Sequence, residues 1–225
     1  MGWLVIERAG IKPYKPYYQT AKRILDLTLC LMLLPLSIPV ALILAILIRL
    51  DSSGPALFVQ ERAGKDGRAF RMYKFRTMHH NIDRDSHRSF MKAYVNGQIK
   101  SNVAGSETIF KPSHDSHVTR TGRILRKTSL DELPQIWNVI KGEMSLVGPR
   151  PNVTWEVEEY QGWHNERLEV YPGITGLAQV RGRSGILFDE IVQYDIEYLE
   201  RRSMMFDLKI LWWTLSSVVL GKGAQ

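Results

Sequence analysis

Apolar positions along the chain form one long segment near the N-terminus and several shorter stretches after it. Residues 27–48 carry no formal charge over 22 positions. As a continuous helix this segment would reach roughly 33 Å, about the thickness of a bilayer core. It begins too late and is too long for a signal peptide. The pattern therefore predicts a membrane helix that stays in the mature protein.

The middle of this segment is interrupted by Pro35 and Pro39, with Ser37 between them. Each proline removes a helical hydrogen bond and clashes with the preceding turn, so we expect a kink or a full break. Lys22 and Arg23 precede the segment, and further basic residues follow it. Because Lys/Arg-rich flanks stay on the cytoplasmic side, a hairpin that enters one leaflet and returns satisfies both ends. A proline-kinked helix that spans the bilayer remains the alternative.

The rest of the chain mixes short strand and helix patterns. Strands are expected at 57–59 and 70–75, and helices at 129–140, 153–169 and 188–202. Residues 79–118 suit a loop or a partly helical excursion, whereas 142–152 and 172–185 suit ordered loops rich in Gly and Pro. Apolar positions at helical spacing in 208–215 fit an interfacial helix or a core-packing terminal helix. We predict an α/β (α+β) architecture, in which residues 1–50 form the membrane segment and 51–225 a small mixed domain with interfacial helices.

Composition and charge narrow the class of protein. With 44% hydrophobic residues the chain is not disordered, and a single cysteine excludes an intrachain disulfide framework. The first 80 residues hold twelve Lys/Arg and five Asp/Glu, and the remainder balances, so the whole excess of +7 flanks the apolar segment. This distribution indicates a membrane-surface anchor with an acidic partner. Nucleic acid is disfavoured, because aromatic residues do not interleave with a basic stripe.

Asp131 and Glu132 form the most informative polar pair. Pro134 fits only the first turn of a helix, so a helix is expected to start around residues 130–133 with Asp131 as its N-cap. Asp131 could serve only as that cap, or Ser129 and Glu132 could form a capping box. The same geometry also suits phosphate chemistry, because a helix N-terminus attracts anions and two adjacent carboxylates can hold Mg²⁺.

Two carboxylates alone would repel a diphosphate, so cations are needed beside them. Arginine matches phosphate oxygens bidentately, and lysine supplies a point charge. The candidates for binding the phosphates are Lys74, Arg76, Arg126 and Arg150. Gln179 and Arg181 are candidates for binding the nucleotide or the sugar.

Four stretches resemble motifs of the bacterial sugar transferases and follow one another in the same order as in that family. These enzymes are the monotopic polyprenyl-phosphate hexose-1-phosphate transferases, and this chain resembles their short form. They are FVQERAGKDGRAF at 58–70, KFRTM at 74–78, TRTGRILRKTSLDELPQIWNVIKGEMSLVGPRP at 119–151 and PGITGLAQVRGR at 172–183. The family commonly breaks its re-entrant hairpin at a Ser-Pro pair, whereas this chain has Ser37-Ile38-Pro39.

The resemblance implies transfer of a sugar 1-phosphate from a UDP-sugar to undecaprenyl phosphate, with release of UMP. It implies that Asp131 is the nucleophile and, with Glu132, the Mg²⁺-associated dyad. Lys74, Arg126 and Arg150 correspond to basic positions around the phosphates, and Asp195 to a further acidic position of the functional core, where it would bind substrate. The membrane element would be the re-entrant hairpin.

The resemblance also implies a place in the cell and a pathway. The protein would lie on the bacterial cytoplasmic membrane, with its catalytic domain facing the cytoplasm. It would carry out the first membrane step of polysaccharide or glycoconjugate assembly. The sequence leaves the sugar and the oligomeric state open, a homodimer being one option. A non-catalytic adapter that binds anionic lipid would also explain the charge distribution, but not carboxylates among phosphate-suited arginines.

Overall fold

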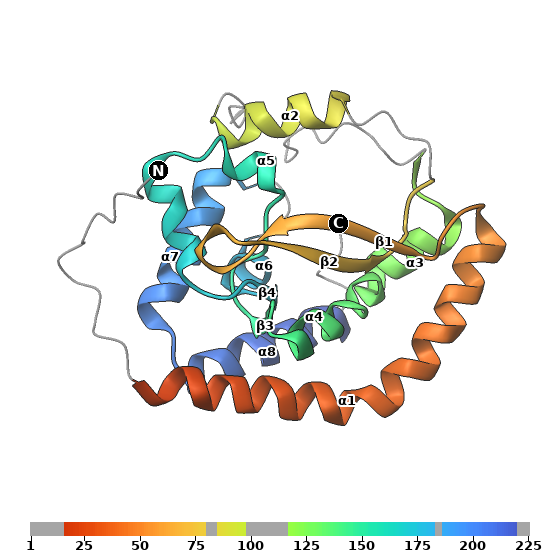
Figure 1. Ribbon diagram of the computed structural model, residues 1–225, viewed down its shortest axis with the longest axis horizontal. Coiled ribbons are helices and arrows are strands. Elements are labelled where there is room, and N and C mark those ends of the chain that lie inside the picture. The colour runs from red at the N-terminus through yellow and green to blue at the C-terminus, as the bar shows by residue number, and fades with distance from the viewer. Residues whose placement is uncertain (1–15, 80–84, 98–116, 183–185, 220–225) are drawn as a thin grey trace.

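The computed structural model describes residues 16–79, 85–97, 117–182 and 186–219. Helices surround two small sheets (Figure 1). In chain order the elements are α1 (Pro16–Asp51), β1 (Leu57–Ala63), η1 (Lys65–Gly67), β2 (Ala69–Phe75), α2 (Asp85–Val95), α3 (Arg120–Thr128), η3 (Leu130–Glu132), α4 (Gln135–Lys141), β3 (Ser145–Val147), α5 (Thr154–Val157), η4 (Gly162–Glu169), β4 (Gly173–Thr175), α6 (Leu177–Arg181), α7 (Phe188–Arg201) and α8 (Met204–Val219).

The apolar segment forms one bent helix. Its 36 residues include Pro35 and Pro39 without an interruption of the helix, and the ribbon bends sharply about midway along its length (Figure 1). The expected kink is therefore present, whereas a full break is not. Between the two prolines the hydroxyl of Ser37 donates a hydrogen bond to the carbonyl of Leu34 at 3.2 Å. Such side-chain bonds help proline-containing apolar helices to stay continuous.

Both ends of α1 are attached to the globular part of the chain. Near its start, Lys22 Nζ lies 2.9 Å from Asp207 Oδ2 of α8, and the Arg23 guanidinium donates to the last carbonyls of α4 at 2.6 and 2.9 Å. At its end, Asp51 Oδ2 accepts a 2.8 Å bond from the backbone N–H of Thr121 in α3. The two basic residues expected to flank the membrane segment thus bind the domain itself.

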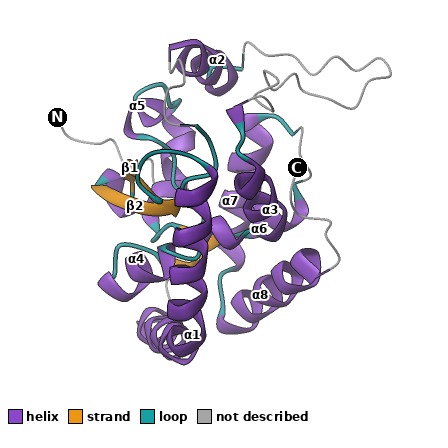
Figure 2. Ribbon diagram, turned by 90° about the vertical axis from the view of Figure 1, so that its right-hand side faces the viewer, coloured by secondary structure: helices purple, strands orange, loops and turns teal. Residues whose placement is uncertain are grey.

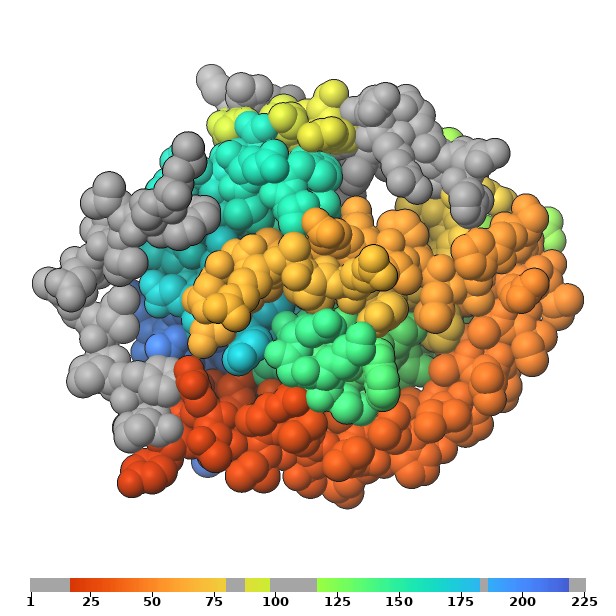
Figure 3. All heavy atoms as spheres, viewed as in Figure 1, coloured from red at the N-terminus to blue at the C-terminus, as the bar shows by residue number. Residues whose placement is uncertain are grey.

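A β-hairpin and α4 form one broad face of the molecule, which α1 borders below and on the right (Figure 3). β1 and β2 pair antiparallel from Leu57 opposite Phe75 to Ala63 opposite Ala69. The Asn138 side chain fixes α4 to this hairpin, because it donates to the Arg71 carbonyl at 2.7 Å and accepts from the Tyr73 N–H at 3.1 Å. Asn138 therefore sets the position of β2 relative to the segment that precedes α4.

The second sheet is a short parallel pair, β3 and β4, at the centre of the main core. Around it pack side chains from the hairpin, α1, α4, α6, α7 and α8, among them Cys30, Met72, Val139, Leu177, Tyr198 and Ile210. The two expected loops 142–152 and 172–185 were thus wrong in part. They contain these strands and α6, because the strands are only three residues long and show no alternation of their own.

The other predicted elements compare as follows. The strands at 57–59 and 70–75 and the helix at 188–202 are confirmed. The helix expected at 153–169 is instead the short α5 and the 3-10 helix η4. Within the excursion 79–118 the described part contains α2, and residues 80–84 and 98–116 lie outside the described residues.

The terminal helix α8 packs on the core, as one of its two expected roles requires, and its interfacial role stays a prediction. One side is buried against the core through Phe206 and Ile210, and the other exposes Leu208, Trp212 and Leu215. An exposed apolar stripe on a helix that also packs on α1 and α6 is typical of a surface that lies against a membrane.

Gly122 allows α3 to touch the end of the KFRTM segment. A Cβ at this position would lie 2.1 Å from the carbonyl oxygen of Thr77, and that backbone has little freedom to move. We expect Gly122→Ala to lower the free energy of unfolding by more than about 2 kcal/mol, measured by urea unfolding in detergent. Gly162→Ala is the matched control, because nothing lies within 4 Å of its Cβ. Equal stability of the two variants would contradict the close approach.

Candidate active site

The two adjacent carboxylates lie on η3, a single 3-10 turn between α3 and α4. Ser129 ends α3 in the left-handed conformation (φ 55°) and so turns the chain sharply into η3. Pro134, not Asp131, is the N-cap residue of α4. The prediction that Asp131 caps the helix was therefore wrong: its side chain is turned inward and only 5% exposed.

Two cations from distant parts of the chain meet these carboxylates. Lys74 of β2 places Nζ 2.6 Å from Asp131 Oδ2 and 3.9 Å from Glu132 Oε1. Arg150, on the loop after β3, places a guanidinium nitrogen 2.8 Å from Glu132 Oε1. The Arg150 side chain remains 45% exposed and Lys74 22%, so both cations are open to solvent. The site is therefore a carboxylate pair beside cations that an anion from solution can approach.

The cations keep the Glu132 carboxyl ionised. Burial alone would raise its pKa, but Arg150, Lys74 and Arg62 together hold the pKa below its usual range. In return, Glu132 raises the pKa of the Arg150 guanidinium. Glu132 is thus a carboxylate at neutral pH, as an oxygen ligand for a metal or a proton acceptor must be.

Arg62 is a third cation of the site that sequence reasoning missed. Its guanidinium donates to Gln60 Oε1 at 2.6 Å and to the Pro151 carbonyl at 3.2 Å, next to Arg150. Burial lowers the pKa of the Arg62 guanidinium to about 10. The negative charge of Glu156 opposes this shift, and the positive charge of Arg150 adds to it. Lys74 pairs with Phe58, and residues 58 and 62 share one side of β1, so Arg62 and Lys74 project from the same face of the hairpin. The pairing of the two predicted strands was the signal from which Arg62 could have been predicted.

Arg167 is a second residue missed, and it supports the loop that carries Arg150. Its buried guanidinium donates to the Arg150 carbonyl at 3.0 Å, to Asn152 Oδ1 at 2.8 Å and to the Tyr160 hydroxyl at 3.0 Å. Asp195 of α7 pairs with it at 2.7 Å. The structure thus places Asp195 behind Arg167, where it orients the support of the site.

The remaining predicted ligands have contacts elsewhere. Arg76 is buried and donates to the Ser52 carbonyl and hydroxyl at the end of α1. Arg181 pairs with Glu197 of α7 at 3.0 Å, and Gln179 reaches only the Ile174 carbonyl of β4 at 3.5 Å. Arg126, exposed on α3, donates to the Thr77 hydroxyl at 3.0 Å. The structure therefore brings together Asp131, Glu132, Lys74 and Arg150. The other predicted ligands, Arg76, Arg126, Gln179 and Arg181, are not part of this group.

The carboxylate pair also fits a divalent cation in part. In the described ranges no group of three or more His, Cys, Asp or Glu side chains could hold a metal ion. Mg²⁺ commonly binds one or two carboxylates, with phosphate oxygens and water completing six ligands. Asp131 and Glu132 suit that arrangement, provided that a phosphorylated substrate supplies further oxygens.

The site combines a buried and a half-buried carboxylate with a Lys and an Arg, on a domain tied to a long apolar helix that is compatible with a membrane. The family model for bacterial sugar transferases matches residues 17–221. The chain belongs to the bacterial sugar transferase family.

Several curated proteins match most of the chain. It is 43% identical over 217 residues to the galactosyl transferase CpsE of Streptococcus agalactiae, covering 96% of this chain and 46% of CpsE. It is 38% identical to the uncharacterized sugar transferase EpsL of Bacillus subtilis, covering 91% of this chain and 90% of EpsL. It is 39% identical to the UDP-glucose:undecaprenyl-phosphate glucose-1-phosphate transferase of Caulobacter vibrioides, covering 88% of this chain and 69% of that protein. The chain thus spans less than half of CpsE and nearly all of EpsL.

Proposed function

We propose that the protein transfers a sugar 1-phosphate from a UDP-sugar to undecaprenyl phosphate and releases UMP, as a membrane step of polysaccharide assembly. The observation that carries the proposal is the contact of Lys74 with Asp131 and of Arg150 with Glu132. Family membership supports it, as does the name of the Caulobacter relative, a UDP-glucose:undecaprenyl-phosphate glucose-1-phosphate transferase.

The reaction would proceed in two displacements. One oxygen of Asp131 forms a bond to the sugar-linked phosphorus while the bond from that phosphorus to the UMP oxygen breaks, and UMP leaves with the electron pair. An oxygen of undecaprenyl phosphate then attacks the same phosphorus, and the Asp131 carboxylate is released. Lys74 binds Asp131 through Oδ2, which leaves Oδ1 as the attacking atom. Lys74 and Arg150 would stabilise the charge that develops on the phosphate oxygens.

Mg²⁺ is the proposed cofactor, held by Asp131 and Glu132. When bound, it would withdraw charge from the diphosphate oxygens and the leaving UMP. We expect excess EDTA to reduce UMP release by at least about 100-fold, because several kcal/mol of transition-state stabilisation are lost. Added Mg²⁺ should restore the rate, and Ca²⁺ should restore less of it, since it prefers longer bonds and more ligands. Full activity in EDTA would contradict a metal requirement.

The way in which α1 is attached supports a placement in one leaflet of the membrane. Lys22 and Arg23 hold its start to α8 and α4, and Asp51 holds its end to α3. Because both ends contact one domain, a bent helix that enters and leaves the same leaflet is favoured over one that spans the bilayer. Basic flanks at both ends support the cytoplasmic face. A homodimer stays a prediction.

Isotope labelling tests the two-step reaction. Purified protein is incubated with a UDP-sugar carrying ³²P in its β-phosphate, with no acceptor, and is then quenched and analysed by mass spectrometry. We expect a phosphosugar adduct on the peptide containing Asp131, which disappears when undecaprenyl phosphate is added. Offering several UDP-sugars identifies the donor. Product formation with no labelled protein at any time would rule out the covalent intermediate.

A further inference from the structure

The outer face of α3 carries a basic and apolar stripe. Arg120, Arg123, Ile124 and Lys127 follow each other at helical spacing and are all exposed, with Ile124 at 65%. The opposite side of the helix is buried through Leu125. Cations around a protruding apolar side chain are typical of helices that lie on a membrane surface.

The charges of this stripe are available for a partner. The helix contains four Arg or Lys and no Asp or Glu. Arg123 and Lys127 take part in none of the ion pairs among the described residues. Arg126 differs from them, since it turns back to the Thr77 hydroxyl. Among the described residues, Arg123 and Lys127 are therefore positive charges without an acidic partner, whereas Arg120 acts on Asp51 and helps to lower its pKa.

The stripe lies next to the C-terminal half of α1. Leu125 and Ile48 belong to one buried cluster, and Asp51 accepts the hydrogen bond from Thr121 in the first turn of α3. At the end of α1, Arg49 and Leu50 are exposed as well, Leu50 at 79%. Figure 2 shows α3 beside α1. The basic surface thus continues the apolar surface of the one helix that is long and apolar enough for a membrane among the described residues.

We propose that the outer face of α3 binds the headgroups of anionic phospholipids, with Ile124 inserted among them. Charge complementarity identifies the occupant, because each Lys or Arg near an anionic membrane surface strengthens binding about fivefold. Continuity with the apolar surface of α1 favours a lipid headgroup over a free anion as the ligand. Since α3 leads through Ser129 directly into η3, this contact also holds Asp131 and Glu132 at headgroup depth.

A fluorescent probe on the stripe tests the proposal. Ile124→Cys is labelled with an environment-sensitive dye in a Cys30→Ala background and reconstituted in vesicles that contain brominated lipid. We expect quenching at least about twofold stronger with one third phosphatidylglycerol than with phosphatidylcholine alone, and a loss of that difference in high salt. Arg123→Gln/Lys127→Gln should abolish the difference, yet retain UMP release in neutral detergent micelles.

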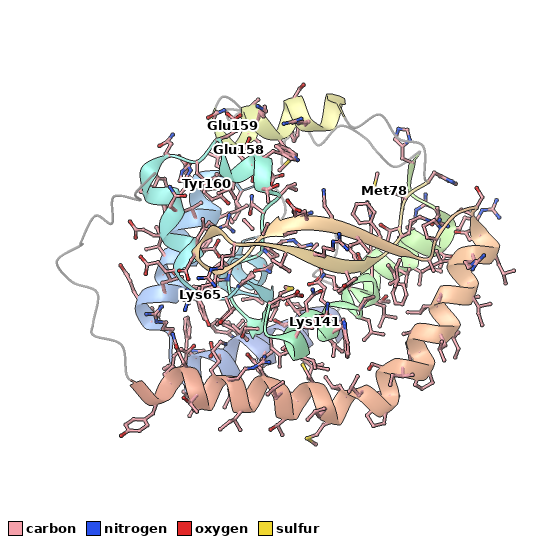
Figure 4. All side chains as sticks on the ribbon, in the orientation of Figure 1. Lys65, Met78, Lys141, Glu158, Glu159 and Tyr160 are labelled. Atoms are coloured by element: carbon pink, nitrogen blue, oxygen red, sulfur yellow. The ribbon has the colours of Figure 1, made fainter. Side chains whose placement is uncertain are left out.

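Arg68→Gln/Arg71→Gln is the matched control with the same change of charge. Both residues are exposed on the β-hairpin, towards its turn at Lys65, which lies at the opposite end of the hairpin from Met78 (Figure 4). This variant should keep the wild-type response. Equal quenching in both kinds of vesicle, or an equal loss in the two double variants, would overturn the proposal. Quenching that depends on protein concentration but not on lipid would also overturn it, in favour of a second copy of the chain.

Discussion

Replacement of Asp131 by Asn is expected to lower turnover by at least about 1000-fold, because the attacking carboxylate oxygen is lost. Asn keeps the shape of the side chain, so the buried turn η3 should persist. No phosphosugar adduct should form on the variant, while its binding to membranes should stay at the wild-type level. UMP release and mass spectrometry of the quenched protein measure the two effects.

Asp66→Asn is the control for this substitution. Asp66 is exposed in the hairpin turn with φ 57°, a conformation that Asn tolerates, and we expect wild-type turnover. If Asp131→Asn retained more than about a tenth of the activity, the nucleophile would lie elsewhere. If wild-type protein released no UMP from any UDP-sugar, the non-catalytic adapter would become the better explanation.

Replacement of Arg167 by Met is expected to cost about 3–5 kcal/mol of stability, because it leaves the Asp195 carboxylate buried without its cation. Both side chains are almost fully buried, at 2% and 1% exposed. Arg167→Met/Asp195→Leu should cost less than Arg167→Met alone, since the double change removes the orphaned charge. Urea unfolding in detergent micelles gives the free energies.

The pH dependence of the Arg167→Met variant supplies an independent check. Burial raises the pKa of Asp195 to about 6 even though Arg167 opposes the shift, so without Arg167 this pKa should rise further. A group with a raised folded-state pKa binds more protons when folded, and stability is lost as the pH rises through that pKa. The cost of Arg167→Met should therefore be larger at pH 8 than at pH 5.

An exposed arginine provides the comparison. Arg201→Met, which removes an i,i+4 partner of Glu197, should cost less than about 0.5 kcal/mol at either pH. If Arg167→Met were equally harmless, Asp195 would not depend on Arg167. Its role would then have to be a direct contact with substrate, as the family resemblance first implied.

Local patterns predicted the parts of the fold that depend on nearest neighbours. The uncharged run 27–48, its two prolines and the hairpin strands could be found in the chain, because length, composition and alternation are local properties. The three-residue strands β3 and β4 could not, since their pairing joins residues 28 positions apart in a parallel register. Proline position suggested a helix start at Asp131, but the left-handed Ser129 changed the course of the chain.

The sequence by itself determined the chemistry that is available: an Asp-Glu pair, a surplus of Lys and Arg, and a membrane-length helix with basic flanks. Only the tertiary structure decided which cations serve the pair. Lys74 and Arg150 pair with these carboxylates and Arg62 acts on Glu132 through its charge, whereas Arg76 and Arg181 are bound at the end of α1 and by α7. The reason is physical: an ion pair depends on distances of a few ångströms between residues far apart in the chain, and folding alone sets those distances.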